Sequence, residues 1–158
     1  GGSMQEMRMD GFDIAILDAL QRDGAMTNAA LAELVNLSPS QCSRRRQRLE
    51  EDGLIKGYRA VLDRDRLGFS LVNVISVTLA THNRDNARRF AELLRGLPEV
   101  QEAHALTGEM DYVLKVVTRD LKSLSEFVND VLLPHESVQH VKTAIVLETL
   151  KEGGPLPL

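Results

Sequence analysis

Four arginines within five positions, Arg44, Arg45, Arg46 and Arg48, form the densest group of positive charge in the chain. A guanidinium can bind a DNA phosphate or bond O6 and N7 of guanine together, and Ser and Gln side chains can hydrogen-bond base edges. An exposed basic helix face that only confers solubility would carry the same residues, so position along the chain must decide. The candidate DNA contacts are Ser38, Ser40, Gln41, Ser43, Arg44, Arg45, Gln47 and Arg48.

The segment that carries the arginines has the clearest helix start in the sequence. Ser38 fits an N-cap, Pro39 fits the first helical position, and Gln41 lies where it completes a capping box with Ser38. We predict a helix that runs to about Asp52 and is ended by Gly53.

Two shorter helices are predicted before it, over residues 11–23 with Gly24 as the stop, and from Thr27 to about Asn36. A basic third helix after a short turn is typical of a helix-turn-helix, whose third helix enters the major groove of double-stranded DNA. This position favours DNA contact over a purely solubilising face.

A second group of chemically capable residues joins two predicted strands: Thr107, Gly108, Glu109, Met110, Asp111 and Tyr112. Gly108 has no side chain, so the carboxylate of a ligand could reach backbone N–H groups there. Asp111 could receive an α-ammonium group, or it could order the loop by accepting its N–H groups. From the residues alone, a hairpin whose Gly and Asp serve only the turn is the alternative to an effector site.

Other reactive side chains do not form a motif. The four histidines, His82, His104, His135 and His140, are scattered, and we predict neither a metal site nor a cofactor. Cys42 lies on the inward stripe of the third helix, which predicts a buried thiol. Without a phosphate-binding Gly loop or a nucleophile motif, the sequence disfavours an enzyme.

The second half of the chain changes to β-branched runs that alternate with helical patterns. We predict strands at 71–79, 100–106, 112–118 and 138–147, and helices at 85–95 and 122–133. The order β-α-β-β-α-β is that of a ferredoxin-like sandwich. The fold class is therefore α+β: an N-terminal helix-turn-helix, winged-helix-like domain followed by a ferredoxin-like domain.

Charge and turn residues divide the chain further. The net charge of −4 conceals a local +3 over residues 38–66 and a local −3 over residues 68–158. An extended piece from Lys56 to Leu62 could form a short strand pair or wing. We predict a tag remnant and flexible N-terminus at 1–9, a helix-turn-helix at 10–55, a strand linker at 56–68, a sensing and dimerisation domain at 69–150, and a flexible tail at 151–158.

Bulk composition predicts a globular cytoplasmic protein without a membrane partner. Hydrophobic residues make up 43% of the chain, but no apolar run reaches the roughly 18–20 residues of a membrane span. No signal peptide is recognisable, and Gly1-Gly2-Ser3 is typical of a cloning remnant.

Together these segments resemble the bacterial leucine-responsive and asparagine-type regulators, the Lrp/AsnC family. Residues 13–20 resemble the family's first helix, and Thr107–Tyr112 resembles its effector loop. Further matches in order are Leu37-Ser38-Pro39, Arg45, Leu49-Glu50, Gly53-Leu54-Ile55 and Gly57-Tyr58, so the resemblance covers about residues 10–150. It implies homodimers built through the sheet domains, often assembled into octamers, and gene control by amino acids or related metabolites.

Two positions depart from the family pattern. Arg46 stands where an apolar residue is usual, so it must snorkel to the helix edge, pair with a carboxylate, or serve as an extra DNA contact. Met110 replaces an aromatic residue, which predicts a pocket of different shape and selectivity.

The function that we predict is a sequence-specific transcriptional regulator whose activity or assembly responds to a small effector, an amino acid. The alternative is a DNA-architectural protein that wraps DNA with no obligatory effector. A stabilising amino acid in a thermal-shift screen would distinguish them.

Overall fold

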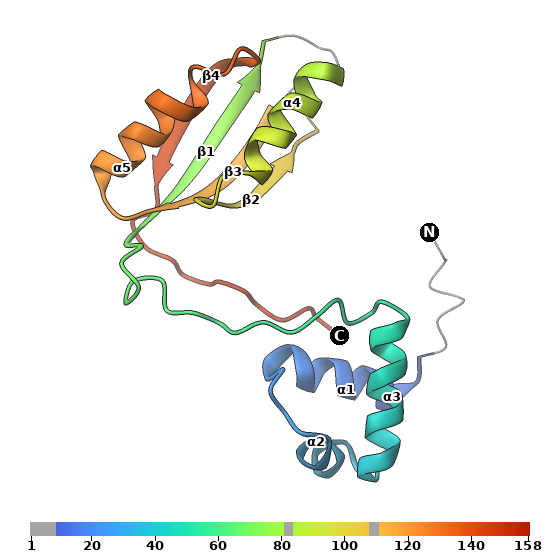
Figure 1. Cartoon of the computed structure of the whole chain (residues 1–158). Helices are drawn as coiled ribbons and strands as arrows, with labels where there is room; N and C mark the ends of the chain where they lie inside the picture. Colours follow the sequence, from blue (N-terminus) through green and yellow to red (C-terminus); the bar gives the residue numbers. More distant parts are fainter. Residues whose placement is uncertain (1–8, 81–83, 108–110) are drawn as a thin grey trace. The chain divides into compact units, whose positions relative to one another are not determined.

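The computed structural model describes residues 9–80, 84–107 and 111–158, and the chain forms two compact units. One unit contains the residues up to Val61 together with Lys151–Leu158, and the other is Leu62–Leu150 (Figure 1). The helices are α1 (Gly11–Arg22), α2 (Asn28–Val35), α3 (Pro39–Glu51), α4 (Arg84–Arg95), α5 (Leu121–Glu126) and the π-helical η2 (Phe127–Leu132); the strands are β1 (Leu71–Leu79), β2 (Val100–Ala105), β3 (Asp111–Thr118) and β4 (Val138–Ile145).

The first unit consists of α1, α2 and α3 around one apolar core. Its buried members are Ile16, Ala19, Leu20, Leu31, Ala32, Val35, Cys42 and Leu49. Each helix begins at a side-chain cap: Asp10 for α1, Thr27 for α2 and Ser38 for α3. The predicted helix-turn-helix is therefore present, with its third helix capped as the sequence indicated.

Glycine or asparagine lies at the end of each of these three helices. Gly53, with φ of +77°, follows α3 as predicted, and Asn36 ends α2 in the left-handed region with φ of 60°. Gly24 follows the C-cap Asp23 and so stands just beyond the end of α1, as predicted, although its φ is not positive. The Tyr58 ring packs beside it, so a Cβ on Gly24 would lie 3.1 Å from Tyr58 Cδ1.

The segment after α3 contains no strand up to Ser70. The strand pair or wing that the sequence suggested for Lys56–Leu62 is thus not formed within this single chain. In the tail that the sequence predicted as flexible, Gln21 Nε2 donates to the carbonyl oxygen of Leu156 at 2.9 Å and Leu156 N–H donates to Gln21 Oε1 at 2.7 Å. Through this pair the end of the chain contacts α1.

The second unit is a four-stranded antiparallel sheet in the order β2-β3-β1-β4. Helices α4 and α5 lie on the same face of this sheet (Figure 1), and the core between them includes Ile75, Val77, Phe90, Leu114 and Leu132. The predicted ferredoxin-like topology is confirmed. No helix within the described residues is long and apolar enough to cross a bilayer.

Strand alternation fixes which side chains face the helices. Ile75 pairs with Leu114 and Val77 with Tyr112, so these residues lie on the covered face. Val74, one position along β1, lies on the face without helices and is 39% exposed.

The helix predicted at 122–133 is divided into two parts, α5 and η2. In η2, Leu133 N–H donates to Val128 O, five residues back.

Candidate nucleic-acid interface and effector segment

The start of α3 is organised by a reciprocal pair of hydrogen bonds. Gln41 N–H donates to Ser38 Oγ at 3.2 Å, and Ser38 N–H donates to Gln41 Oε1 at 2.9 Å. This is the predicted capping box. Bidentate reading of adenine by Gln41 needs that same amide oxygen, so Gln41 would have to leave the cap to read a base in this way.

Polar candidates lie on the exposed face of α3, and Cys42 lies on its buried face. Ser40, Ser43, Arg44 and Gln47 are exposed, and Gln47 Nε2 donates to Glu51 Oε1 at 3.0 Å. Cys42 is fully buried, and burial raises the pKa of its thiol, which confirms the predicted packing role. The described residues provide no carboxylate partner for Arg44.

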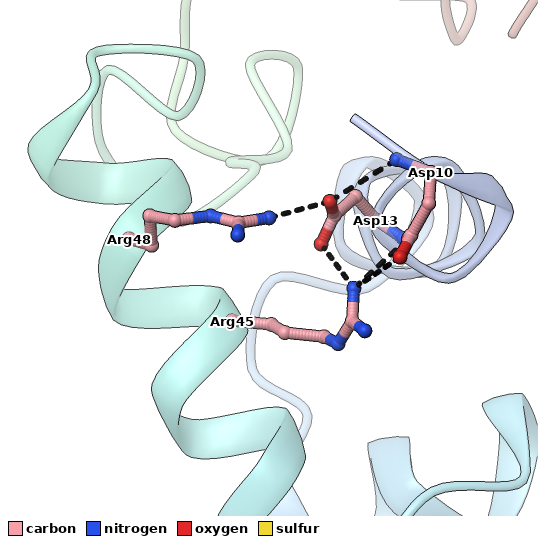
Figure 2. A network of polar contacts seen from close by, with 4 residues as sticks. All are labelled: Asp10, Asp13, Arg45 and Arg48. Carbon is pink, nitrogen blue, oxygen red and sulfur yellow. Dashed lines mark hydrogen bonds and ion pairs between the residues drawn. The ribbon is translucent and has the colours of Figure 1, made fainter. Parts of the chain in front are cut away.

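Two of the four arginines point toward α1 (Figure 2). Arg45 Nη1 donates to Asp10 Oδ2 at 2.8 Å and to Asp13 Oδ1 at 3.1 Å, and Arg48 Nη2 donates to Asp13 Oδ2 at 2.5 Å. The Asp13 N–H and the Arg45 guanidinium lower the pKa of Asp10. The carboxylates of Asp10 and Asp13 in turn raise the pKa of Arg45.

Sequence reasoning missed this pair of carboxylates, although a signal for one was present. Asp13 lies three residues before Ile16 and seven before Leu20, so it continues the buried stripe of α1. A carboxylate on an apolar stripe requires hydrogen-bonded, charged partners. Its partners are more than thirty positions away, and only the fold identifies them as Arg45 and Arg48.

Arg46 takes a direction different from that of its neighbours. Its Nη1 donates to the Met26 carbonyl oxygen at 2.7 Å, its Nε donates to Tyr58 Oη at 3.0 Å, and its guanidinium lies 5.0 Å from the centre of the Tyr58 ring. Glu50 is 3.6 Å away, and the Arg46 side chain is only 17% exposed. Of the alternatives that the sequence left open, the geometry matches snorkelling and pairing.

The predicted effector segment is described only at its ends. Gly108, Glu109 and Met110 lie outside the described residues, and Thr107 is exposed. Asp111 and Tyr112 point to opposite faces of the sheet: Thr78 Oγ1 donates to Asp111 Oδ1 at 3.0 Å, whereas the Tyr112 ring packs edge-on against Phe90 with centroids 5.3 Å apart. The structure therefore does not bring these two side chains together.

A hollow of about 390 Å³ lies between α4 and β2. It is lined by Phe90, Ala91, Leu94, Arg95, Val100, Gln101, Glu102, Ala103, Ala105 and Tyr112. Tyr112 thus connects the predicted effector segment to a largely apolar cavity that the sequence did not reveal. No three His, Cys, Asp or Glu side chains of residues 9–80, 84–107 and 111–158 converge on a common point where a metal ion could bind.

A capped, basic helix-turn-helix joined to a ferredoxin-like domain defines a class: DNA-binding regulators with a ligand-binding domain. Family models agree, because the winged helix-turn-helix DNA-binding model matches residues 9–56 and the Lrp/AsnC ligand-binding domain model matches residues 73–156. The chain belongs to the Lrp/AsnC family of transcriptional regulators.

Individual relatives extend the likeness over nearly the whole chain. The chain is 38% identical to a leucine-responsive regulatory protein of Rhizobium meliloti, over 93% of this chain and 94% of that protein. It is 35% identical to the transcriptional regulator AzlB of Bacillus subtilis, over 95% and 96%. A crystal structure of a transcriptional regulator of Neisseria meningitidis in complex with L-Met superposes with a TM-score of 0.91 at 39% identity, covering 95% of this chain and 97% of that one.

Proposed function

We propose that this protein regulates transcription by placing α3 in the major groove of double-stranded DNA and by responding to an amino-acid effector. The observation that carries the DNA part is the outer face of α3, where Ser40, Ser43, Arg44 and Gln47 are exposed near a capped helix start. Helix-turn-helix proteins contact base edges with the N-terminal residues of this helix.

The eight candidate contacts have different tasks in this proposal. Ser40, Ser43 and Gln47 face the bases, and Arg44 and Arg48 bind phosphates. Ser38 and Gln41 hold the helix start, and Arg45 joins α3 to α1, so these three act on DNA through the position of the helix.

The effector in this proposal is a zwitterionic amino acid bound at residues 107–112. The Neisseria meningitidis relative supports the class of ligand, since its crystal structure contains L-Met. Asp111 is the candidate partner for the ammonium group of this ligand. The apolar hollow beside Tyr112 lies on the opposite face of the sheet, so it does not belong to the same candidate site.

The experiment is a thermal-shift screen of the twenty amino acids, followed by calorimetry with the amino acid that stabilises the protein. A specific ligand raises the melting temperature by mass action. Gly108→Val should abolish binding sterically, and Asp111→Ala should weaken it by about ten- to hundredfold if a charge-assisted bond is lost. Both variants should still bind DNA.

Two controls separate sensing from structure. Gly96→Val adds the same bulk where a Cβ meets only Leu93 O at 3.7 Å, and should leave the effector affinity unchanged. Thr78→Val removes the hydroxyl group that donates to Asp111. If this change lowers the effector affinity as much as Asp111→Ala does, the role of Asp111 is to order the loop. If no amino acid stabilises the protein and DNA still binds, the effector-independent architectural function replaces this one.

Assembly through the uncovered sheet face completes the proposal. The helices cover one face only (Figure 1), and on the other face Val74 is exposed and Val113 is half-buried, one on each of the two central strands. A second copy of this chain is the partner that fits, giving a homodimer that can associate further to an octamer. Two-fold symmetry then requires a pseudopalindromic operator.

A further inference from the structure

Asp13 is a buried carboxylate inside the helix-turn-helix, with a side chain only 1% exposed. Burying a charge is costly unless it is paired and hydrogen-bonded. Both charged partners of Asp13 come from α3, the helix that the proposed function places on DNA, and the N–H of the N-cap Asp10 donates to Asp13 Oδ2 at 3.3 Å.

The two arginines are held in different ways (Figure 2). Arg45 uses Nη1 for Asp10 and Asp13 together, and its side chain is 23% exposed. Arg48 makes a single contact with Asp13, through Nη2, and its side chain is 47% exposed. A guanidinium has five N–H donors in one plane, so Arg48 retains donors for a second acceptor while the contact with Asp13 orients the group.

We propose that Asp13 is a positioning residue for DNA recognition: its carboxylate holds the Arg48 guanidinium so that the outer N–H groups meet a DNA phosphate. Arg45 joins α3 to α1 in the same cluster and makes no DNA contact. This inference rests on the proposed function, since it assigns the partner of Arg48 on the DNA side.

Charge alone does not account for this arrangement. Asp10 and Asp13 carry two negative charges against the two positive charges of Arg45 and Arg48, so the cluster adds no net attraction for DNA. What it adds is geometry, because the Asp13 carboxylate holds one side of the Arg48 guanidinium and leaves the exposed part of the side chain for a phosphate. Fixing a side chain before binding reduces the entropy that complex formation costs.

The test is a double-mutant cycle for DNA affinity with the full chain, using Asp13→Asn and Arg48→Ala, at a temperature where circular dichroism shows all variants folded. In the wild-type background, Arg48→Ala should weaken binding by about tenfold or more. In the Asp13→Asn background the same change should weaken it by no more than about twofold, because Arg48 is no longer positioned. Equal losses in both backgrounds would overturn the proposal and leave Asp13 a purely structural residue.

Arg44→Ala is the matched control, because the described residues show no contact between Arg44 and Asp13. Its loss of affinity should be the same in both backgrounds. If neither Arg44→Ala nor Arg48→Ala changes DNA affinity, the proposed DNA contact through α3 fails as a whole, which differs from failure of the positioning role alone.

Arg48→Lys keeps the test valid if Asp13→Asn does not fold. Lysine keeps the charge but lacks the planar set of donors that can bridge a carboxylate and a phosphate. The affinity should fall to within about threefold of Arg48→Ala, and the salt slope should fall by nearly one, because a lysine that is not positioned does not maintain the phosphate contact. Wild-type affinity for Arg48→Lys would show that a point charge suffices and would contradict the proposal.

Discussion

Ser38, the N-cap of α3, and Ser43, within α3, have different tasks. Ser38 accepts the N–H of Gln41 and holds the helix start, whereas Ser43 is exposed in the next turn. Both residues were candidates for DNA contact on sequence grounds, but only Ser43 has a side chain without a role in the cap.

This difference predicts distinct effects of two alanine substitutions. Ser38→Ala should lower the free energy of unfolding by about 1 kcal/mol, since an N-cap is lost, and should weaken binding to all DNA sequences alike. Ser43→Ala should change stability by less than about 0.5 kcal/mol and alter the relative affinity for operator variants. Denaturant titration and competition binding measure the two effects. Unchanged sequence preference in Ser43→Ala would remove that residue from base reading.

Prediction from the sequence succeeded where partners are close along the chain. The capping box of Ser38 and Gln41 spans three positions, and type and spacing alone reveal it. The contact of Asp13 with Arg48 spans thirty-five positions and depends on how α1 crosses α3, which no local pattern encodes. The partner of Asp111 was missed for the same reason, because Thr78 lies on a strand that pairs only in the folded sheet.

At the scale of elements, Arg46 connects α3 to the turn between α1 and α2 and to the segment that follows α3. It reaches the Met26 carbonyl oxygen, the Tyr58 hydroxyl and the Glu50 carboxylate from one guanidinium. Tyr58 in turn donates to Glu50 at 2.8 Å, and burial followed by this bond raises the pKa of the Tyr58 phenol.

Arg46→Ala should therefore destabilise the first unit and leave the salt dependence of DNA binding unchanged. Loss of a charge-assisted hydrogen bond and of ring stacking predicts a fall of about 1.5–3 kcal/mol in the free energy of unfolding. Tyr58→Phe, which removes only the hydroxyl, should cost less. Thermal unfolding and the salt dependence of DNA binding measure these effects; unaltered stability with a salt slope reduced by about one would make Arg46 a DNA contact instead.

Element boundaries followed the hydrophobic pattern closely in the second unit. The strand at 71–79 was predicted at its observed limits, Leu71–Leu79, because β-branched residues alternate between two faces there. The π-helical turn of η2 and the packing of the Tyr58 ring against Gly24 were not predicted. Both depend on tertiary packing: a ring fills the space at Gly24, and the i to i+5 bond of η2 leaves no distinct residue pattern.

The whole molecule depends, in our proposal, on the uncovered face of the sheet. Val74 is central on that face, paired with Lys115 on one side and Ala144 on the other. Val74→Asp would place a carboxylate in a sheet-to-sheet dimer interface, where removing it from water costs more than pairing with its cross-strand neighbour Lys115 returns, so it should convert the dimer to a monomer and weaken operator binding at least about tenfold.

Light scattering at micromolar concentration checks the oligomeric state. Leu121→Asp is the control, because Leu121 is exposed at the start of α5 and lies outside the sheet. A dimer that persists in Val74→Asp, or a wild-type protein that is monomeric on and off DNA, would refute assembly through this face.

The central claim is that α3 binds DNA, and the salt dependence of affinity tests it most directly. The Arg44→Ala, Arg48→Ala double variant should reduce the slope of log affinity against log salt by nearly two for each chain bound, and Arg45→Ala should leave the slope unchanged because Arg45 is paired with Asp10 and Asp13. Titrations of an operator fragment at several salt concentrations give these slopes. Wild-type affinity and slope in the double variant would exclude α3 as the DNA-binding helix.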